Sequence, residues 1–170
     1  MHLVIVSGRS GAGKSSVLGV LEDMNFYCID NLPVAMLEEA VTTLFTDSPG
    51  RNLAVSIDIR TLGQPTDVPE LVASLKPKVS RLDIVFMDAS DESLGRRFSE
   101  TRRLHPLSTG FEGSHLSDAF KDEHLRLEPI RVSSNLKIDS SELSIHSLRQ
   151  QIREFASGQV ATKLILKLQS

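Results

Sequence analysis

The sequence lacks several features that would point to particular functions. It holds a single cysteine, Cys28, so no internal disulfide can form, and we expect a strand residue buried in a reducing, cytoplasmic protein. One cysteine also excludes a zinc finger, and the histidines at positions 2, 115, 124 and 146 have no metal-ligand spacing. No apolar run approaches the roughly 18 residues of a membrane span, so we expect no membrane contact.

Positive charge is not in excess either. The formal net charge is -3 and the sequence pI is about 5.9, whereas non-specific binding to nucleic acid depends on many Lys and Arg contacts to phosphate. Any contact with RNA or DNA must therefore come from a local patch or from another segment. Internal repeats and low-complexity tracts are absent from the sequence, and 170 residues with 40% hydrophobic content suit one domain with a buried core.

Apolar runs alternate with segments of helical periodicity along the chain. The run at residues 3–6 ends after four residues at Ser7 and Gly8, so we interpret it as a buried strand and not as a signal peptide. Four further strands are predicted at residues 26–29, 53–59, 82–87 and 136–138, with helices at residues 14–24, 33–45, 68–79, 91–103, 117–130 and 144–156. This alternation predicts an α/β fold of three layers with a mostly parallel sheet and right-handed crossovers.

Two segments do not fit this alternation. Residues 105–116 contain Pro106, Gly110 and Gly113 among polar residues, which predicts a long exposed loop of the kind that forms lids. The tail at residues 158–170 alternates apolar and polar positions, as in a terminal edge strand or the start of a missing carboxyl-terminal domain. We take the second interpretation and assign residues 1–157 to one domain.

The strongest motif is GRSGAGKS at residues 8–15, which matches G-x-x-x-x-G-K-[ST] between a predicted strand and a predicted helix. Glycines let successive N–H groups turn toward phosphate oxygens, and the helix dipole adds positive potential. In such a loop the Lys14 side chain contacts the β- and γ-phosphates and the Ser15 hydroxyl ligates Mg²⁺. The motif therefore predicts a P-loop NTPase or kinase-like fold that binds ATP or GTP through the residues Gly8, Arg9, Ser10, Gly11, Ala12, Gly13, Lys14 and Ser15.

An acidic residue at a strand end is expected to complete the Mg²⁺ site. Asp58 follows the third predicted strand and Asp88 follows the fourth. We prefer Asp58, because in P-loop folds this carboxylate comes from the strand beside the one that feeds the loop. Asp88 then lies near the nucleotide or caps the following helix.

Further polar candidates follow the second strand and precede the long loop. Asp30 either orients a phosphate acceptor or, with Asn31, caps the helix that begins at Pro33. Arg102 and Arg103 are candidate lid arginines, since arginine suits bidentate phosphate contacts. The neighbouring Arg96 and Arg97 are weaker candidates, because part of this cluster fits a solvated helix face, and we interpret His105 as a loop residue rather than a general base.

Four segments together resemble the amino-terminal domain of the RapZ/YvcJ family, the bacterial RNase adapter proteins: SGRSGAGKS, LEDMNFYCIDNLP, AVSIDIR and RRFSETRRLHPL. The resemblance covers nearly the whole chain and implies binding of ATP and GTP with weak hydrolysis. By position it assigns nucleotide contacts to residues 8–15 and GTP contacts to Asp58, Ile59, Arg60 and Thr61. One departure is Asn25, where the family usually has glycine, and we expect it to alter a turn.

The resemblance also implies binding partners for which this sequence contains no recognisable binding site. In enterobacterial members the protein presents a small regulatory RNA to an RNase and so controls amino-sugar synthesis, through a carboxyl-terminal domain absent here. The chain is then a regulatory nucleotide-binding module with Lys14 and Asp58 as catalytic residues. The alternative is a small-molecule kinase with Asp30 at its acceptor. Base preference and oligomeric state are not predicted.

Overall fold

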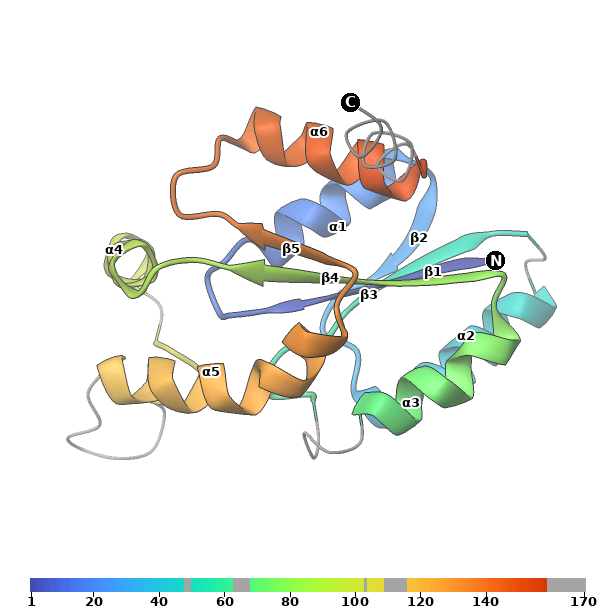
Figure 1. Ribbon diagram of the computed structural model, residues 1–170, viewed down its shortest axis with the longest axis horizontal. Coiled ribbons are helices and arrows are strands. Elements are labelled where there is room, and N and C mark those ends of the chain that lie inside the picture. The colour runs from blue at the N-terminus through green and yellow to red at the C-terminus, as the bar shows by residue number, and fades with distance from the viewer. Residues whose placement is uncertain (48–49, 63–67, 103, 109–115, 159–170) are drawn as a thin grey trace, which may run out of the picture.

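The fold was described from a computed structural model that covers residues 1–47, 50–62, 68–102, 104–108 and 116–158 (Figure 1). In this part of the chain five strands form one sheet in the order β2-β3-β1-β4-β5, and every neighbouring pair is parallel. The strands are β1 (His2–Gly8), β2 (Phe26–Ile29), β3 (Asn52–Ser56), β4 (Arg81–Asp88) and β5 (Leu136–Asp139). The predicted α/β fold class and parallel sheet are confirmed.

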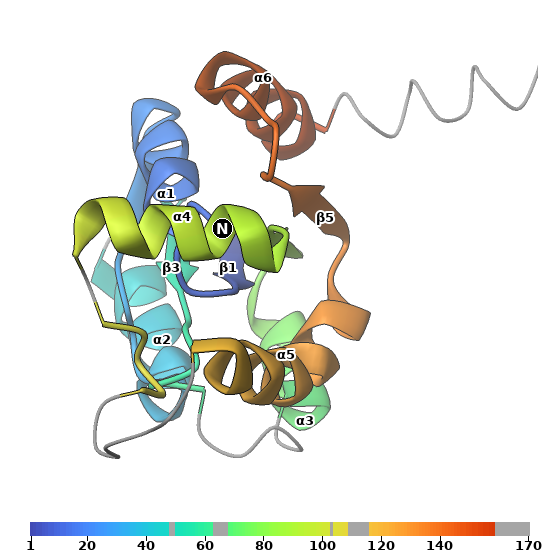
Figure 2. The same ribbon diagram turned by 90° about the vertical axis from the view of Figure 1, so that its left-hand side faces the viewer.

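Helices cover both faces of the sheet, as Figure 1 shows. They are α1 (Lys14–Asp23), α2 (Leu37–Asp47), α3 (Val68–Leu75), α4 (Asp91–Thr101), α5 (Leu116–Ser133) and α6 (Ile145–Ala156), with short 3-10 turns η1 (Val34–Met36) and η3 (Lys76–Lys78). Helices α1 and α6 lie on one face, α2, α3 and α5 on the other, and α4 crosses the carboxyl edge (Figure 2). None of these helices combines the length and apolar character needed to cross a membrane.

The core is divided by the sheet because adjacent strand residues point to opposite faces. On β1, Val4 and Val6 belong to the cluster under α1 and α6, while Leu3 and Ile5 belong to the cluster under α2, α3 and α5. All four side chains are at most 1% exposed. This double burial explains why the strand is an unbroken apolar run in the sequence.

Several element boundaries differ from the predictions. Strand β3 ends at Ser56, because the chain turns at Asp58, where the Thr61 N–H donates to the Asp58 carbonyl at 3.0 Å. Helix α3 ends at Leu75 and continues only as the 3-10 turn that contains Pro77, which lacks the N–H of a regular helix. Helix α4 ends at Thr101, because Arg102 adopts a left-handed conformation with φ of 51°. Helix α5 continues past Pro129 to Ser133.

Two predicted segments lie wholly or partly outside the described residues. The tail is described only at Gly158, so its alternating pattern stays an interpretation of the sequence. Of the predicted lid loop, residues 105–108 and Leu116 are described, and Leu116 already belongs to α5.

Candidate functional site

The glycine loop, residues 8–15, connects β1 to α1 at the carboxyl edge of the sheet. Gly8 has φ of 137°, and a Cβ at this position would lie 2.0 Å from the Met87 carbonyl oxygen of β4. The next residue anchors the loop, because the Arg9 N–H donates to the same carbonyl at 3.0 Å. Gly13 has φ of 102° and directly precedes α1. Only glycine combines the positive φ of position 8 with the close approach of the Met87 carbonyl. The backbone geometry therefore requires the first glycine of the motif.

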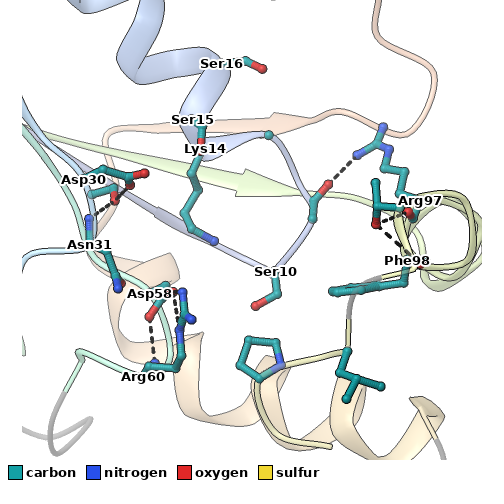
Figure 3. A pocket seen from close by; sticks show the side chains of 16 residues that line it. Ser10, Lys14, Ser15, Ser16, Asp30, Asn31, Asp58, Arg60, Arg97 and Phe98 are labelled. Atoms are coloured by element: carbon teal, nitrogen blue, oxygen red, sulfur yellow. Dashed lines mark hydrogen bonds and ion pairs between the residues drawn. The ribbon is translucent and has the colours of Figure 1, made fainter. Parts of the chain in front are cut away.

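The loop opens onto a cavity of about 630 Å³ that α1, the strand ends and α4 surround. Figure 3 shows the Lys14 side chain pointing into this cavity between two groups of side chains. Asp30, Asn31, Asp58 and Arg60 lie on one side of it. The opposite side is formed by residues of α4 and the following segment, namely Arg97, Phe98, Thr101, Leu104 and Pro106.

Lys14 lies against the main chain of the loop. Its Nζ donates to the Gly8 carbonyl at 2.8 Å and to the Arg9 carbonyl at 3.2 Å. Burial lowers the pKa of this ammonium, and the nearby carboxylates of Glu123 and Asp58 oppose the lowering. The site therefore holds a desolvated cation, and a bound anion would stabilise its charged form.

Asp58 is 6% exposed and lies just beyond the end of β3. Burial by itself would raise the pKa of its carboxyl, but hydrogen bonds from the Arg60 side chain and main chain outweigh burial and the pKa is lowered. The Arg60 guanidinium contacts Oδ2 at 2.6 and 3.0 Å, and the Asn31 amide donates to both carboxylate oxygens at 3.1 and 3.2 Å. Asp58 is thus an ionised carboxylate held in place from two sides.

The two strands beside β1, namely β3 and β4, each have an acidic residue at or just beyond their carboxyl end, so adjacency to β1 does not separate the two candidates. Asp58 follows β3 and lines the cavity, whereas Asp88 at the end of β4 accepts from the Ala89 N–H at 2.9 Å and lies 3.8 Å from the Arg9 guanidinium. The geometry therefore favours Asp58 as the cavity carboxylate.

Asp30 lines the cavity as well. Its carboxylate accepts a short hydrogen bond from the Ser56 hydroxyl, which itself accepts from the Asn31 N–H at 2.7 Å. Pro33 precedes the 3-10 turn η1 without a side-chain hydrogen bond, so the interpretation of Asp30 or Asn31 as a helix cap is wrong.

Some predicted ligands present no side chain to the cavity. Arg9 is 5% exposed and points away from it, because its guanidinium donates to the Ala89 carbonyl at 3.0 Å and to Asp91 at 2.6 Å. Ile59 is 8% exposed and packs in the core below α2, and Thr61 closes the turn at Asp58. Gly8 and Ala12 are not among the cavity-lining residues. A ligand could therefore contact only their main-chain groups.

Among the described arginines in and directly after α4, Arg97 and not Arg102 lines the cavity. Arg97 donates to the Gly11 carbonyl of the loop at 3.0 Å and to the Ser140 carbonyl at 2.6 Å. Arg102 follows the end of α4, is exposed and does not line the cavity, and Arg103 lies outside the described residues. Helical spacing provides a usable signal, since Arg97 and Thr101 are four residues apart and both line the cavity.

Sequence reasoning also missed Glu123. This residue of α5 is 0% exposed, and its carboxylate accepts from both the main-chain N–H and the hydroxyl of Ser10. His105, assigned to a loop, is 1% exposed and contacts the same carboxylate at 3.0 Å. Glu123 is one of several charged residues in a helix of ordinary composition, so no local sequence pattern identifies it as a buried residue of the site.

The donor set suits Mg²⁺ only together with a ligand. In the part of the chain that the structure covers, no group of three His, Cys, Asp or Glu side chains could hold a metal by itself. The exposed hydroxyl of Ser15 and the ionised carboxylate of Asp58 do line one cavity, and both are hard oxygen donors. Mg²⁺ is commonly held by one or two such groups plus phosphate oxygens, so these residues fit a phosphate-bound ion.

A parallel sheet with a glycine loop after its central strand defines a P-loop fold of the kinase-like type, and solved structures share it. The shikimate kinase of Bacteroides thetaiotaomicron superposes with a TM-score of 0.61 at 18% identity, covering 92% of this chain and 98% of that one. The YorR protein of Bacillus subtilis, solved in complex with phosphorylated GDP, gives 0.58 at 13% identity, covering 94% and 98%. At these identities the similarity concerns the fold only.

The chain belongs to the family described as RapZ-like N-terminal domain, whose model matches residues 1–160. A nucleotide-binding protein of Colwellia psychrerythraea is 45% identical over 171 residues, covering 100% of this chain and 58% of that protein. One of Stutzerimonas stutzeri is 46% identical over 156 residues, covering 90% and 54%. The resemblance found in the sequence is confirmed, and the chain spans little more than half the length of these relatives.

Proposed function

We propose that this chain binds ATP or GTP with Mg²⁺ in the cavity beside the glycine loop, as the nucleotide module of an RNase adapter-type regulator. One observation carries the proposal: Lys14 lies within the loop with Nζ on the Gly8 carbonyl, facing a cavity that also contains an ionised Asp58. A partly buried cation beside oxygen donors for Mg²⁺ suits a triphosphate. The relatives named nucleotide-binding proteins support the same conclusion.

Each residue has a distinct task in this proposal. The Lys14 ammonium neutralises phosphate charge, and loop N–H groups and the start of α1 add positive potential. Ser15 and Asp58 hold Mg²⁺, which offsets negative charge on the phosphates. Arg60 and Thr61 keep the Asp58 carboxylate and its turn in place, while Ile59 contributes only packing.

We infer that any hydrolysis is slow. A carboxylate whose pKa is lowered is a weak base, and Asp58 is already engaged by Arg60 and Asn31. It therefore suits metal binding better than proton removal from water. Slow turnover fits a module that signals nucleotide occupancy.

The test is nucleotide affinity in a Lys14→Ala variant, measured by calorimetry with MgATP and MgGTP. We expect affinity to fall at least about a hundredfold, because the desolvated cation that faces the phosphates is lost. Lys121→Ala is the matched control, since this lysine of α5 has a side chain 75% exposed, and it should bind as the parent chain does. Unchanged affinity in a folded Lys14→Ala variant would contradict the site.

We further propose that the complete protein couples nucleotide occupancy to a small regulatory RNA and an RNase through its remaining portion. The chain has a net charge of -3 and corresponds to 58% of the Colwellia protein, so these contacts are assigned to the rest of the molecule.

A small-molecule kinase is the second candidate, and the position of Asp30 favours it. This carboxylate lies on the cavity wall with Ser56 and Asn31, across from the loop, where an acceptor hydroxyl would need a hydrogen-bond acceptor. If the chain is a kinase, the correct phosphate acceptor should raise ATP turnover to about 1 to 100 per second. If a panel of sugars, polyols and hydroxy acids leaves turnover slow, this candidate fails.

A further inference from the structure

Ser10 is the residue of the glycine loop that α5 holds most closely. Its main-chain N–H and its hydroxyl both donate to Oε1 of Glu123, at 3.0 and 2.6 Å. Ser10 is 7% exposed and Glu123 is 0% exposed, so neither contact is open to solvent. A carboxylate that accepts from two groups of one residue fixes both the main chain and the side chain at that point of the loop.

The second oxygen of this carboxylate is held by His105. Nε2 of His105 lies 3.0 Å from Oε2, while its Nδ1 accepts from the Leu107 N–H at 3.2 Å. Because Nδ1 accepts, the ring proton lies on Nε2, and a neutral imidazole donates to an anionic Glu123. Phe98 and Phe120 hold the ring by packing on it, each with a centroid distance of 5.4 Å.

The network joins the glycine loop to the wall of the cavity. Leu104 and Pro106 flank His105 and line the cavity, as does Phe98 of α4. Ser10 lines it from the loop side, whereas no described residue of α5 does so. Glu123 therefore contacts residues on both sides of the site, but it does not line the cavity and has no direct contact with a ligand.

Three hydrogen bonds keep Glu123 charged despite burial. Burial would raise the pKa of this carboxyl, but the bonds from His105 and Ser10 outweigh it and the pKa is lowered. An ionised, fully buried group is strongly destabilising unless it is well paired. Such an arrangement is rigid, because any movement of Ser10 or His105 would leave the charge short of a partner.

We propose that Glu123 is the positioning residue of the glycine loop, and that through Ser10 and His105 it makes the loop, α5 and the cavity wall at residues 104–108 respond together to bound nucleotide. This inference rests on the nucleotide binding proposed above. Glu123 acts through Ser10 and does not touch the ligand. Its effect is to hold the loop in its binding conformation before nucleotide arrives.

The test combines nucleotide affinity with hydrogen exchange in Glu123→Gln. Glutamine keeps one oxygen for Ser10, but its NH₂ meets the N–H of His105, so one of the two partners is released. We expect MgATP affinity about tenfold lower and faster exchange of the Ser10 amide. In the parent chain, MgATP should slow exchange in residues 119–127 of α5, and this response should be lost in the variant.

Asp83→Asn provides a matched control, because Asp83 and His2 form a similar buried pair at 2.8 Å near the opposite end of β1. It should lower stability without changing affinity or the exchange response of α5. Ser10→Ala removes only the hydrogen bond from the Ser10 hydroxyl to Glu123, so it should weaken binding by a smaller factor than Glu123→Gln. It replaces Glu123→Gln in the test if that variant folds poorly.

The outcomes separate this inference from the proposed function. A parent chain that binds neither MgATP nor MgGTP overturns both. A parent chain that binds nucleotide, with a folded Glu123→Gln variant of equal affinity and an unchanged α5 response, overturns the role of Glu123 only. Equal losses in Glu123→Gln and Asp83→Asn would also overturn it, since they would reflect general destabilisation.

Discussion

Single residues in this chain are constrained by backbone conformation as much as by chemistry. Among the residues that the structure describes, three other than glycine have positive φ, namely Asn25, Asn31 and Arg102. Asn25 has φ of 67° in the turn between α1 and β2, at the position where the resemblance implies a glycine. Asparagine tolerates this left-handed region better than most residues, and Asn25 does not line the cavity.

Gly8 and Gly19 allow a comparison of two glycine-to-alanine substitutions. Gly8→Ala should destabilise the chain by more than about 3 kcal/mol, because the new Cβ would collide with the Met87 carbonyl. Gly19→Ala should stabilise it by about 0.5–1 kcal/mol, since Gly19 is exposed in α1 and its Cβ would meet nothing within 4 Å. Urea unfolding of both variants measures the two effects, and equal changes would contradict this explanation.

Cys28 should react slowly with thiol reagents. It lies half-buried on the edge strand β2, with Sγ 3.5 Å from the Leu18 carbonyl, so the expectation of full burial is corrected. Burial, together with nearby Glu22, raises the pKa of the thiol to about 11. At pH 8 roughly a thousandth of it is ionised, so iodoacetamide should modify the folded chain far more slowly than the chain in urea. Equal rates would contradict the raised pKa.

At the scale of elements, helix starts follow the sequence closely and helix ends do not. Ser90 and Ser144 cap α4 and α6, each accepting from the main-chain N–H three residues on. The end of α4, by contrast, depends on the left-handed conformation of Arg102, which nothing in its composition indicates. Capping side chains are local signals, whereas many helix ends reflect where the chain must turn to pack.

Ser144→Ala should therefore destabilise the chain by about 1 kcal/mol, because the first turn of α6 loses its cap. Ser99→Ala is the control, since Ser99 is exposed within α4 and alanine is the better helix former. It should leave stability unchanged or slightly higher. Chemical denaturation followed by circular dichroism measures both variants, and equal losses would argue against a capping role.

The link between α5 and the glycine loop also predicts how stability depends on pH. The pKa of Glu123 is lowered in the folded chain from an ordinary value of 4.5, so the unfolded chain takes up its proton first as the pH falls. This contribution to stability is present at neutral pH and is lost as the pH falls below about 4.5 and through the lowered value. Glu123→Gln should lose less stability than the parent chain between pH 7 and pH 3 in urea unfolding, and equal losses would contradict this.

At the scale of the whole molecule, a ligand that binds only the folded chain must stabilise it. At a free nucleotide concentration of about 100 times Kd the gain is about 2.7 kcal/mol, which raises Tm by several degrees in a chain of this size. MgATP or MgGTP should therefore raise Tm of the parent chain and raise Tm of Lys14→Ala much less. A parent Tm that does not respond at saturating nucleotide would count against the proposed module.

Most of the fold could be predicted because its signals are local. The central strands β1, β3 and β4 are apolar runs buried on both faces, and the order of the five strands along the chain, alternating with helices, indicates a parallel sheet. Boundaries were less predictable where the chain leaves the sheet, as at Ser56 and Thr101. There the outcome depends on turn hydrogen bonds and a left-handed residue, not on hydrophobic periodicity.

The site, like the fold, was predictable where its signal is local in the sequence and not where it depends on contacts between distant residues. The glycine loop with Lys14 and Ser15 is one continuous segment, so its motif is legible in the order of residues. The pairing of Ser10 with Glu123 joins positions 113 residues apart, and that of Arg97 with Gly11 joins positions 86 apart. Such contacts form only when α4 crosses the carboxyl edge of the sheet and α5 packs on its face. Packing decided which arginine and which carboxylate support the loop, because side chains distant along the chain meet only through tertiary structure.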